Sequence, residues 1–132
     1  MKIIKLLLAP NKISLLLAVL WTGIILFLSF KAPSVNPKFI FPNQDKIVHF
    51  MFYFVFVFLW FSYLLYKKKP TNLTLILLVL FSIAMGILIE LAQGYLTTTR
   101  QADIYDVLAN SLGSFVAFLI MKTRMKNYSK SF

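Results

Sequence analysis

The sequence contains no cysteine, few acidic residues and a single histidine. Without thiols the chain forms no disulfide, and thiolate catalysis and cysteine-bound zinc or iron–sulfur centres are excluded. Four Asp and Glu residues stand against fourteen Lys and Arg residues, which gives a formal charge of +10. In a soluble protein this charge would suggest a nucleic-acid partner. Here the lysines cluster beside apolar runs, so we expect no nucleic-acid partner and interpret the lysines as signals of membrane topology.

Long apolar runs make up most of the sequence. Apolar residues make up 60% of the 132 residues, and the mean hydropathy is +0.81, well above the composition typical of soluble domains. Because a helix rises about 1.5 Å per residue, about 20 residues cross the hydrocarbon core of a bilayer. The sequence therefore predicts an all-α, polytopic membrane protein, a single domain over 1–132, with four transmembrane helices in an up-down bundle. The predicted helices are about 13–30, 47–66, 73–96 and 104–121.

Breaker residues separate the four runs. Three prolines interrupt the segment 31–46, which predicts a loop at the membrane surface. Three lysines and a proline at 67–70 end the second run, and Thr71 or Asn72 is expected to cap the third helix. The first run follows several lysines, as in a signal peptide. It is longer than a signal-peptide core and no small-residue cleavage site follows it, so we expect it to be retained.

The basic residues are divided unequally between the two ends of the predicted helices. Ten of them lie in the N-terminal flank, in the turn between the second and third helices and in the tail after the fourth, with no acid among them. The other four, Lys31, Lys38, Lys46 and Arg100, share their end with all four acids. Positively charged short loops stay in the cytoplasm, so the sequence predicts that both termini are cytoplasmic and that the acid-bearing loops are outside.

Three of the predicted helices carry a polar stripe near this outer end. The stripes are Asp45–His49–Tyr53, Glu90–Gln93–Thr97 and Asp103–Asp106–Asn110. Each stripe has the spacing of one helical face. Glu90 lies about 9 Å inside the outer end of its helix. Because an ionisable group in hydrocarbon costs several kcal/mol, Glu90 needs a proton or a partner, for which His49, Gln93, Arg100 and Asn110 are candidates.

The stripes are therefore expected to converge into one outward-opening binding pocket. The predicted pocket residues are Asp45, Lys46, His49, Tyr53, Glu90, Gln93, Arg100, Asp103, Asp106 and Asn110. Small residues on the same helices predict close helix packing. They are Gly86, Gly94, Ala109, Gly113 and Ala117.

Three interpretations of this constellation remain open. The first is a structural network that holds the bundle together. The second is a divalent-cation site, since imidazole and carboxylates are suitable ligands, but the spacing matches no tight metal motif, so we expect no metal or cofactor. The third is acid–base chemistry, for which the candidate catalytic residues are His49, Glu90, Asp103 and Asp106. No serine, cysteine or glycine-rich phosphate loop stands in a recognisable nucleophile setting, so no specific reaction can be derived. A non-enzymatic protein is our preferred interpretation.

The polar residues occur in an order that resembles the VanZ-like family of bacterial membrane proteins. The shared pattern is Asp45-Lys46-x-x-His49-Phe50-x-x-Tyr53, Glu90-x-x-Gln93 and Arg100-x-x-Asp103-x-x-Asp106-x-x-x-Asn110-x-x-Gly113. It covers about residues 29 to 121, with Ser29 and Pro33 after the first helix, while Ala117 stands where the family often has a second glycine. The resemblance implies a four-helix protein of the bacterial cytoplasmic (inner) membrane with a role in the cell envelope. It implies no established reaction.

The family name comes from a member that accompanies glycopeptide resistance and raises tolerance to teicoplanin. We therefore expect an envelope protein whose outer pocket recognises a lipid headgroup or an envelope glycolipid and affects susceptibility to glycopeptide-type antibiotics. Two alternatives remain: a membrane enzyme that acts on a lipid-linked substrate at the outer leaflet, and a small transporter or assembly subunit. Because four short helices leave little room for a pore, the transporter would require a homo-oligomer.

Overall fold

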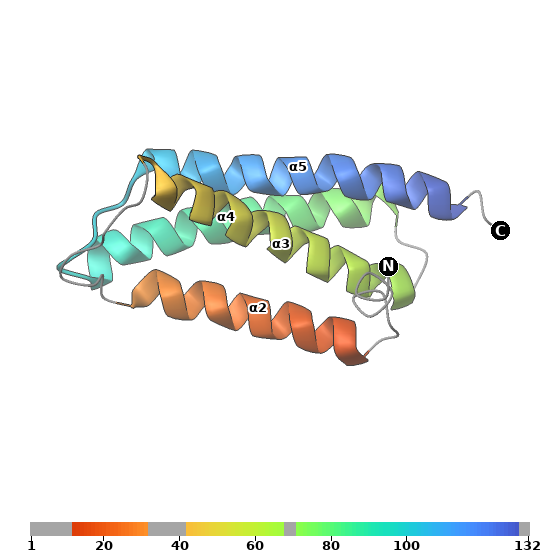
Figure 1. The fold of residues 1–132 in the computed structure, drawn as a ribbon, viewed down its shortest axis with the longest axis horizontal. Helices are drawn as coiled ribbons and strands as arrows, with labels where there is room; N and C mark the ends of the chain where they lie inside the picture. The colour runs from red at the N-terminus through yellow and green to blue at the C-terminus, as the bar shows by residue number, and fades with distance from the viewer. Residues whose placement is uncertain (1–11, 32–41, 68–70, 130–132) are drawn as a thin grey trace.

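Four long helices form the part of the protein that the structure describes (Figure 1). The structure is a computed structural model that describes residues 12–31, 42–67 and 71–129. The helices are α2 (Lys12–Phe30), α3 (Gln44–Lys67), α4 (Asn72–Leu96) and α5 (Ile104–Ser129). Each one is long and apolar enough to cross a membrane. The all-α prediction of four such helices is confirmed.

The helix ends follow from local sequence, and two of them differ from the prediction. Thr71 is the N-cap of α4, since its side chain accepts a hydrogen bond from the N–H of Thr74 at 3.2 Å. α3 begins at Gln44 instead of Ile47, so Asp45 and Lys46 lie in its first turn and not in a loop. Asn43 turns the chain with a φ of 60°, and an acid in the first turn interacts favourably with the helix dipole. Residues 32–41 of the predicted surface loop lie outside the described residues.

The last helix continues well past its predicted end. We expected α5 to stop at Met121 and a basic tail to follow, but the helix extends to Ser129. No glycine or proline interrupts 122–129, and Lys, Arg and Met are good helix formers. Positive side chains near a helix C-terminus are also favourable, so the charges of this segment support the helix.

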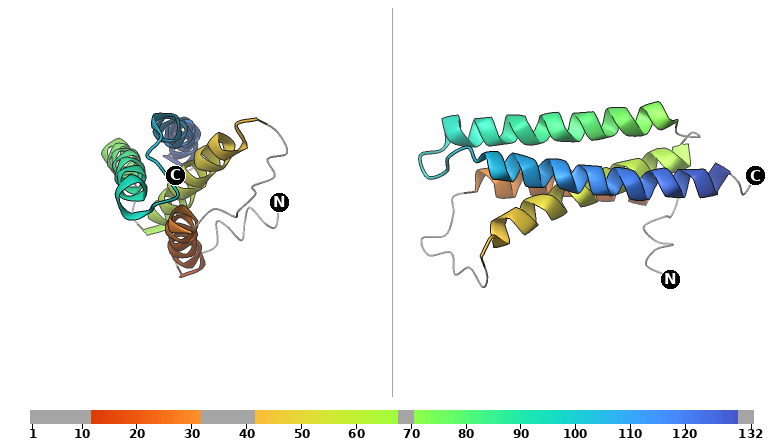
Figure 2. Two further views of the ribbon diagram at one scale, coloured as in Figure 1. Left: turned by 90° about the vertical axis from the view of Figure 1, so that its left-hand side faces the viewer. Right: turned by 90° about the horizontal axis from the view of Figure 1, so that it is seen from above.

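Consecutive helices run in opposite directions (Figures 1 and 2). The C-terminal ends of α2 and α4 therefore lie at the same end of the bundle as the N-terminal ends of α3 and α5 (Figure 1). α3 is central, because it packs against each of the other three helices and most extensively against α5. At Gly113 a Cβ atom would run into the backbone carbonyl of Phe50 and lie 3.1 Å from the backbone nitrogen of Phe54. The backbones of α3 and α5 thus meet at a position that admits only glycine.

Aromatic side chains connect α3 to the neighbouring helices. Tyr53 and Phe61 are fully buried in the core. Two indole N–H groups form hydrogen bonds between α2 and α3. Trp21 donates to the carbonyl of Phe52 at 2.9 Å, and Trp60 donates to the hydroxyl of Thr22 at 3.0 Å. Most of the outward-facing surface of the helices remains apolar, with many large aliphatic and aromatic side chains exposed. A lipid environment is the natural cover for such a surface.

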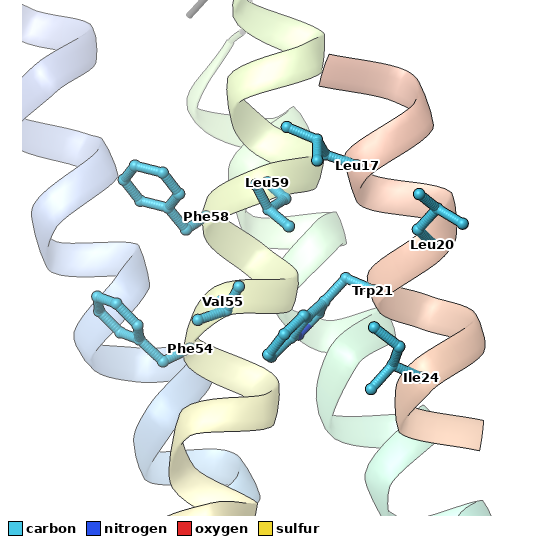
Figure 3. A pocket seen from close by; sticks show the side chains of 8 residues that line it. All are labelled: Leu17, Leu20, Trp21, Ile24, Phe54, Val55, Phe58 and Leu59. Carbon is cyan, nitrogen blue, oxygen red and sulfur yellow. The ribbon is translucent and has the colours of Figure 1, made fainter. Parts of the chain in front are cut away.

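An apolar groove lies between α2 and α3 (Figure 3). It has a volume of about 440 Å³. Its lining residues are Leu17, Leu20, Trp21, Ile24, Phe54, Val55, Phe58 and Leu59. None of these residues is among those predicted for the polar pocket, so the groove is separate from that pocket.

Candidate functional site

Polar side chains gather at the end of the bundle where α3 and α5 begin and α4 ends. We call this group the polar cluster. Its members are Asp45, Lys46, His49, Glu90, Asp103, Asp106 and Asn110. The members from α3 lie in its first two turns. Asp106 and Asn110 lie in the first two turns of α5, and Asp103 directly precedes this helix. Residues four apart on each helix face the same neighbour. α4 contributes a single carboxylate from its last two turns.

The ammonium group of Lys46 is the centre of the exposed half of the polar cluster. It forms ion pairs with Asp45 at 2.8 Å, with Asp103 at 2.5 Å and with Asp106. These pairs join α3 to the start of α5. The hydrogen bond from Lys46 holds the pKa of Asp103 below its ordinary value, and the backbone N–H of Tyr105, which donates to Asp103 at 2.8 Å, acts in the same direction.

The imidazole of His49 is the centre of the buried half. Its Nδ1 atom lies 3.1 Å from Oδ1 of Asn110, a distance at which a protonated Nδ1 donates a hydrogen bond. Its Nε2 atom lies 3.5 Å from Oδ2 of Asp106, and Nδ1 lies 3.7 Å from Oε1 of Glu90. Three side chains from α4 and α5 therefore surround the imidazole ring that α3 contributes.

Glu90 is the deepest charged group of the polar cluster, with 1% of its surface exposed. Its Oε2 atom accepts a hydrogen bond from the backbone N–H of Asp103 at 3.3 Å. Its Oε1 atom is buried and has no hydrogen-bond partner among the residues that the structure describes. A buried acceptor without a partner costs about 1–3 kcal/mol, and more when it is charged. Protonation of Glu90, or a cation bound at Oε1, would remove this cost.

Exposure decreases steadily along the polar cluster from its rim to Glu90. The side chains of Asp45 and Asp103 are 44% and 37% exposed, that of Lys46 is 24% exposed, and those of His49 and Asp106 are 13% and 14% exposed. The side chain of Glu90 is 2% exposed. The polar cluster is thus open at the end of the bundle and closed toward the middle of the helices.

Three of the predicted pocket residues are not members of the polar cluster. Gln93 donates to the carbonyl of Ser29 at 2.6 Å and so connects α4 to the last turn of α2. The backbone N–H of Arg100 donates to the hydroxyl of Thr97 at 3.2 Å, and no ion pair joins Arg100 to any of the four acids, all of which the structure describes. Tyr53 is buried one turn below His49, and its hydroxyl has no hydrogen-bond partner within the described ranges.

The small residues lie close to the polar cluster. A Cβ on Gly86 would stand 3.2 Å from Nδ2 of Asn110 and 3.3 Å from the ring of Tyr53, and a Cβ on Gly94 would stand 3.3 Å from the backbone nitrogen of Ala102. Gly86 thus leaves room for the amide that contacts His49. Ala117 is fully buried, whereas Ala109 is only partly buried.

Two serines below the polar cluster were missed in the sequence analysis. Ser82 and Ser114 share a buried hydrogen bond of 2.7 Å between α4 and α5, and the hydroxyl of Ser114 is also 3.0 Å from the carbonyl of Asn110, to which it donates. The spacing of Ser114 four residues after Asn110 was a usable signal, because it continues the polar stripe of α5 by one turn.

Carboxylates outnumber cationic groups in the polar cluster. All four acids of the protein lie in it, against Lys46 and an imidazole. Two sets of side chains place possible ligand atoms within 4.8 Å of one another: His49, Glu90 and Asp106, and Asp45, Asp103 and Asp106. The arrangement can bind a cation or exchange protons between the imidazole and a carboxylate.

Comparisons with known proteins agree with the pattern of these residues. A family model described as VanZ/LLP1 matches residues 13–125, which cover most of each of the four helices and the whole polar cluster. The chain is also 35% identical to an uncharacterised protein of Schizosaccharomyces pombe over 81 residues, 60% of this chain. This chain spans about half of that relative, since the match covers 47% of its length. No solved structure matches the chain.

Proposed function

The chain belongs to the VanZ/LLP1 family, and from this membership we propose that it is an envelope-related protein of the cytoplasmic membrane whose polar cluster binds the headgroup of an envelope molecule. The helices and the family together identify it as a multi-pass membrane protein. In the proposal the polar cluster faces the non-cytoplasmic side and both termini face the cytoplasm. The excess of lysine in the sequence segments before α2, between α3 and α4 and in the last part of the chain supports this orientation.

The observation that carries the proposal is the grading of exposure within the polar cluster. Asp45, Lys46 and Asp103 are accessible at the end of the bundle, where the headgroups of the outer leaflet would lie, while His49 and Glu90 extend the cluster inward. Charged side chains in a spanning bundle are costly, and they usually mark a functional site. A headgroup with hydrogen-bonding or charged groups would contact the accessible members first.

Antibiotic susceptibility tests this function. In cells that lack the gene, we expect the wild-type protein to change the minimal inhibitory concentration of teicoplanin. We expect Asp106→Asn to lose this effect although the protein still accumulates in the membrane, because Asp106 contacts both Lys46 and His49. Gln101→Ala is the matched control, since it alters an exposed polar residue of the α4–α5 connection outside the polar cluster. A fully active Asp106→Asn protein would contradict the proposal.

A membrane enzyme that acts on a lipid-linked substrate is the second candidate. The observation that favours it is the unpartnered Oε1 atom of Glu90, 3.7 Å from Nδ1 of His49, which is an arrangement suited to proton transfer. Lipid profiles of deletion cells complemented with wild type or His49→Ala distinguish the two candidates. Catalysis requires that a lipid accumulate in the deletion and His49→Ala cells but not in the wild type. Identical lipid profiles would reject catalysis and leave the binding function.

A further inference from the structure

His49, Glu90 and Asp106 share a pattern of contacts. In each side chain one polar atom contacts another group of the protein, and the second polar atom remains available to a ligand. Asp106 contacts Lys46 through Oδ1, and its Oδ2 atom points toward the imidazole. Glu90 accepts from the N–H of Asp103 through Oε2, and its Oε1 atom is without a hydrogen-bond partner in the described part of the chain. His49 contacts Asn110 through Nδ1, which leaves Nε2.

In metal sites, one atom of a ligand side chain commonly binds a neighbouring protein group, and the other atom binds the metal ion. A ligating histidine usually donates its second ring N–H to an oxygen, which fixes the tautomer and the orientation of the ring. Asn110 supplies this oxygen, because its Oδ1 atom is 3.1 Å from Nδ1 of His49. The Nε2 atom then carries a lone pair, while Lys46 and the backbone of Asp103 orient the two carboxylates.

The distances also suit a common ion. Two ligand atoms bound to one zinc-sized ion lie about 3–3.5 Å apart, since each is about 2.1 Å from the metal. Nε2 of His49 and Oδ2 of Asp106 are 3.5 Å apart. One ligand atom from each of the three side chains lies within 4.8 Å of the others. Oε1 of Glu90 is 3.7 Å from Nδ1 of His49, so the Glu90 carboxylate has to move toward Nε2 when the three side chains share an ion.

The other possible ligand set is already occupied by a positive charge. Asp45, Asp103 and Asp106 all bind the ammonium group of Lys46, which stands where a cation would be held. When all four carboxyl groups of the polar cluster are ionised, however, one lysine does not balance them, and the excess negative charge includes the buried Glu90. A divalent cation on the buried side of the cluster would reduce this charge and provide a partner for Oε1 of Glu90.

We propose that His49 through Nε2, Glu90 through Oε1 and Asp106 through Oδ2 bind one divalent transition-metal ion. Asn110 is a positioning residue that orients the imidazole. One nitrogen and two carboxylate ligands suit Zn²⁺ or Mn²⁺. Three protein ligands leave at least one coordination position for water or for an oxygen of a bound headgroup. The metal site does not depend on which envelope molecule the protein recognises.

Metal binding by the purified full-length protein in lipid nanodiscs tests this proposal. The protein is stripped with a chelator, dialysed against ZnCl₂ or MnCl₂, and analysed for bound metal per chain. We expect one ion per wild-type chain, and its loss in His49→Ala and Glu90→Gln. Asn110→Ala should weaken binding about 10- to 100-fold without removing a ligand.

Asp45→Asn is the matched control for charge. It removes one carboxylate of the polar cluster, as Asp106→Asn does, but Asp45 is outside the proposed ligand set. We expect Asp45→Asn to bind metal nearly as tightly as wild type and Asp106→Asn to lose binding. Equal weakening by the two variants would show that the ion is attracted by charge alone and would overturn the proposal, as would the absence of stoichiometric binding by the wild type.

A spectroscopic measurement on the wild type covers the case in which a ligand variant fails to fold. Mn²⁺ bound at the site should show the electron–nuclear coupling of one imidazole nitrogen in pulsed electron paramagnetic resonance. The sequence has a single histidine, so this nitrogen can come only from His49. Bound Mn²⁺ without nitrogen coupling would reject the site.

Discussion

Lys46 differs from the other basic residues of the protein in the number of acids that it contacts. Most lysines of the chain stand beside apolar runs in the sequence, with no acid among them, whereas Lys46 neutralises part of a group of three aspartates. Removing one partner from such a group leaves the remaining charges to repel one another. At the scale of single residues, the ionisation of Asp103 is therefore tied to Lys46.

We expect Lys46→Met to raise the pKa of Asp103 toward its ordinary value of 3.8, because the hydrogen bond from Lys46 is the main cause of the lowering. A carboxyl group whose pKa is lower in the folded state stabilises the fold above its unfolded pKa. This stabilisation is lost as the pH falls below about 4 and through the folded pKa. An NMR titration of the Asp103 carboxyl carbon measures the shift.

Lys122→Met is the control for this titration, because Lys122 lies near the opposite end of α5. It should leave the titration of Asp103 as in wild type. If Asp103 titrated at the same pH in wild type and Lys46→Met, the ion pair would not be responsible for the lowered pKa.

Gly113 determines how closely α3 and α5 approach each other at the scale of helices. The site depends on this approach, because Lys46 and His49 on α3 must reach Asp106 and Asn110 on α5. The contact lies one turn below Asn110, where the backbone of Phe50 faces the glycine. A small residue at this point therefore serves the packing of the helices and the geometry of the polar cluster together.

Gly113→Ala should lower the free energy of unfolding by about 1–3 kcal/mol, because the added methyl group has no room and the helices must move apart. Gly23→Ala is the matched control. A Cβ on Gly23 of α2 meets nothing within 4 Å, so this change should be neutral or stabilising by up to about 1 kcal/mol. Chemical denaturation in detergent micelles measures both variants. Equal stabilities of the two alanine variants would refute the role given to Gly113.

The orientation of the whole molecule follows in our proposal from the unequal distribution of charge. The end that carries the polar cluster includes Thr98 in the connection between α4 and α5, and the opposite end includes Thr71 before α4. Both residues are exposed. Because the chain contains no cysteine, a single introduced cysteine reports the location of its own position.

We expect a membrane-impermeant maleimide to label Thr98→Cys in intact cells. Thr71→Cys should be labelled only after the cells are permeabilised, since the proposed orientation places the connection between α3 and α4 in the cytoplasm. The reverse labelling pattern would place the polar cluster in the cytoplasm and would exclude recognition of a headgroup of the outer leaflet.

The number of helices and the membership of the polar cluster were largely predictable from local sequence. The apolar runs identified all four helices because spanning a bilayer requires about 20 apolar residues without regard to neighbours. Helical periodicity placed Asp45 with His49 and Asp106 with Asn110, because residues four apart on one helix share a face in any fold. The end of α5 was misjudged because charge was taken as a sign of a tail, although lysine and arginine favour a helix.

Which polar groups meet one another was decided only by the tertiary structure. Sequence spacing indicates the residues of one face, but it does not tell how each helix is rotated or which face of a neighbour it meets. Lys46 therefore emerged as the partner of three aspartates, whereas Arg100 contacts none of the acids and Gln93 reaches Ser29. The pairings of Lys46 with Asp106 and of His49 with Asn110 follow from the close approach of α3 and α5 at Gly113, which brings together side chains about 60 residues apart in the chain.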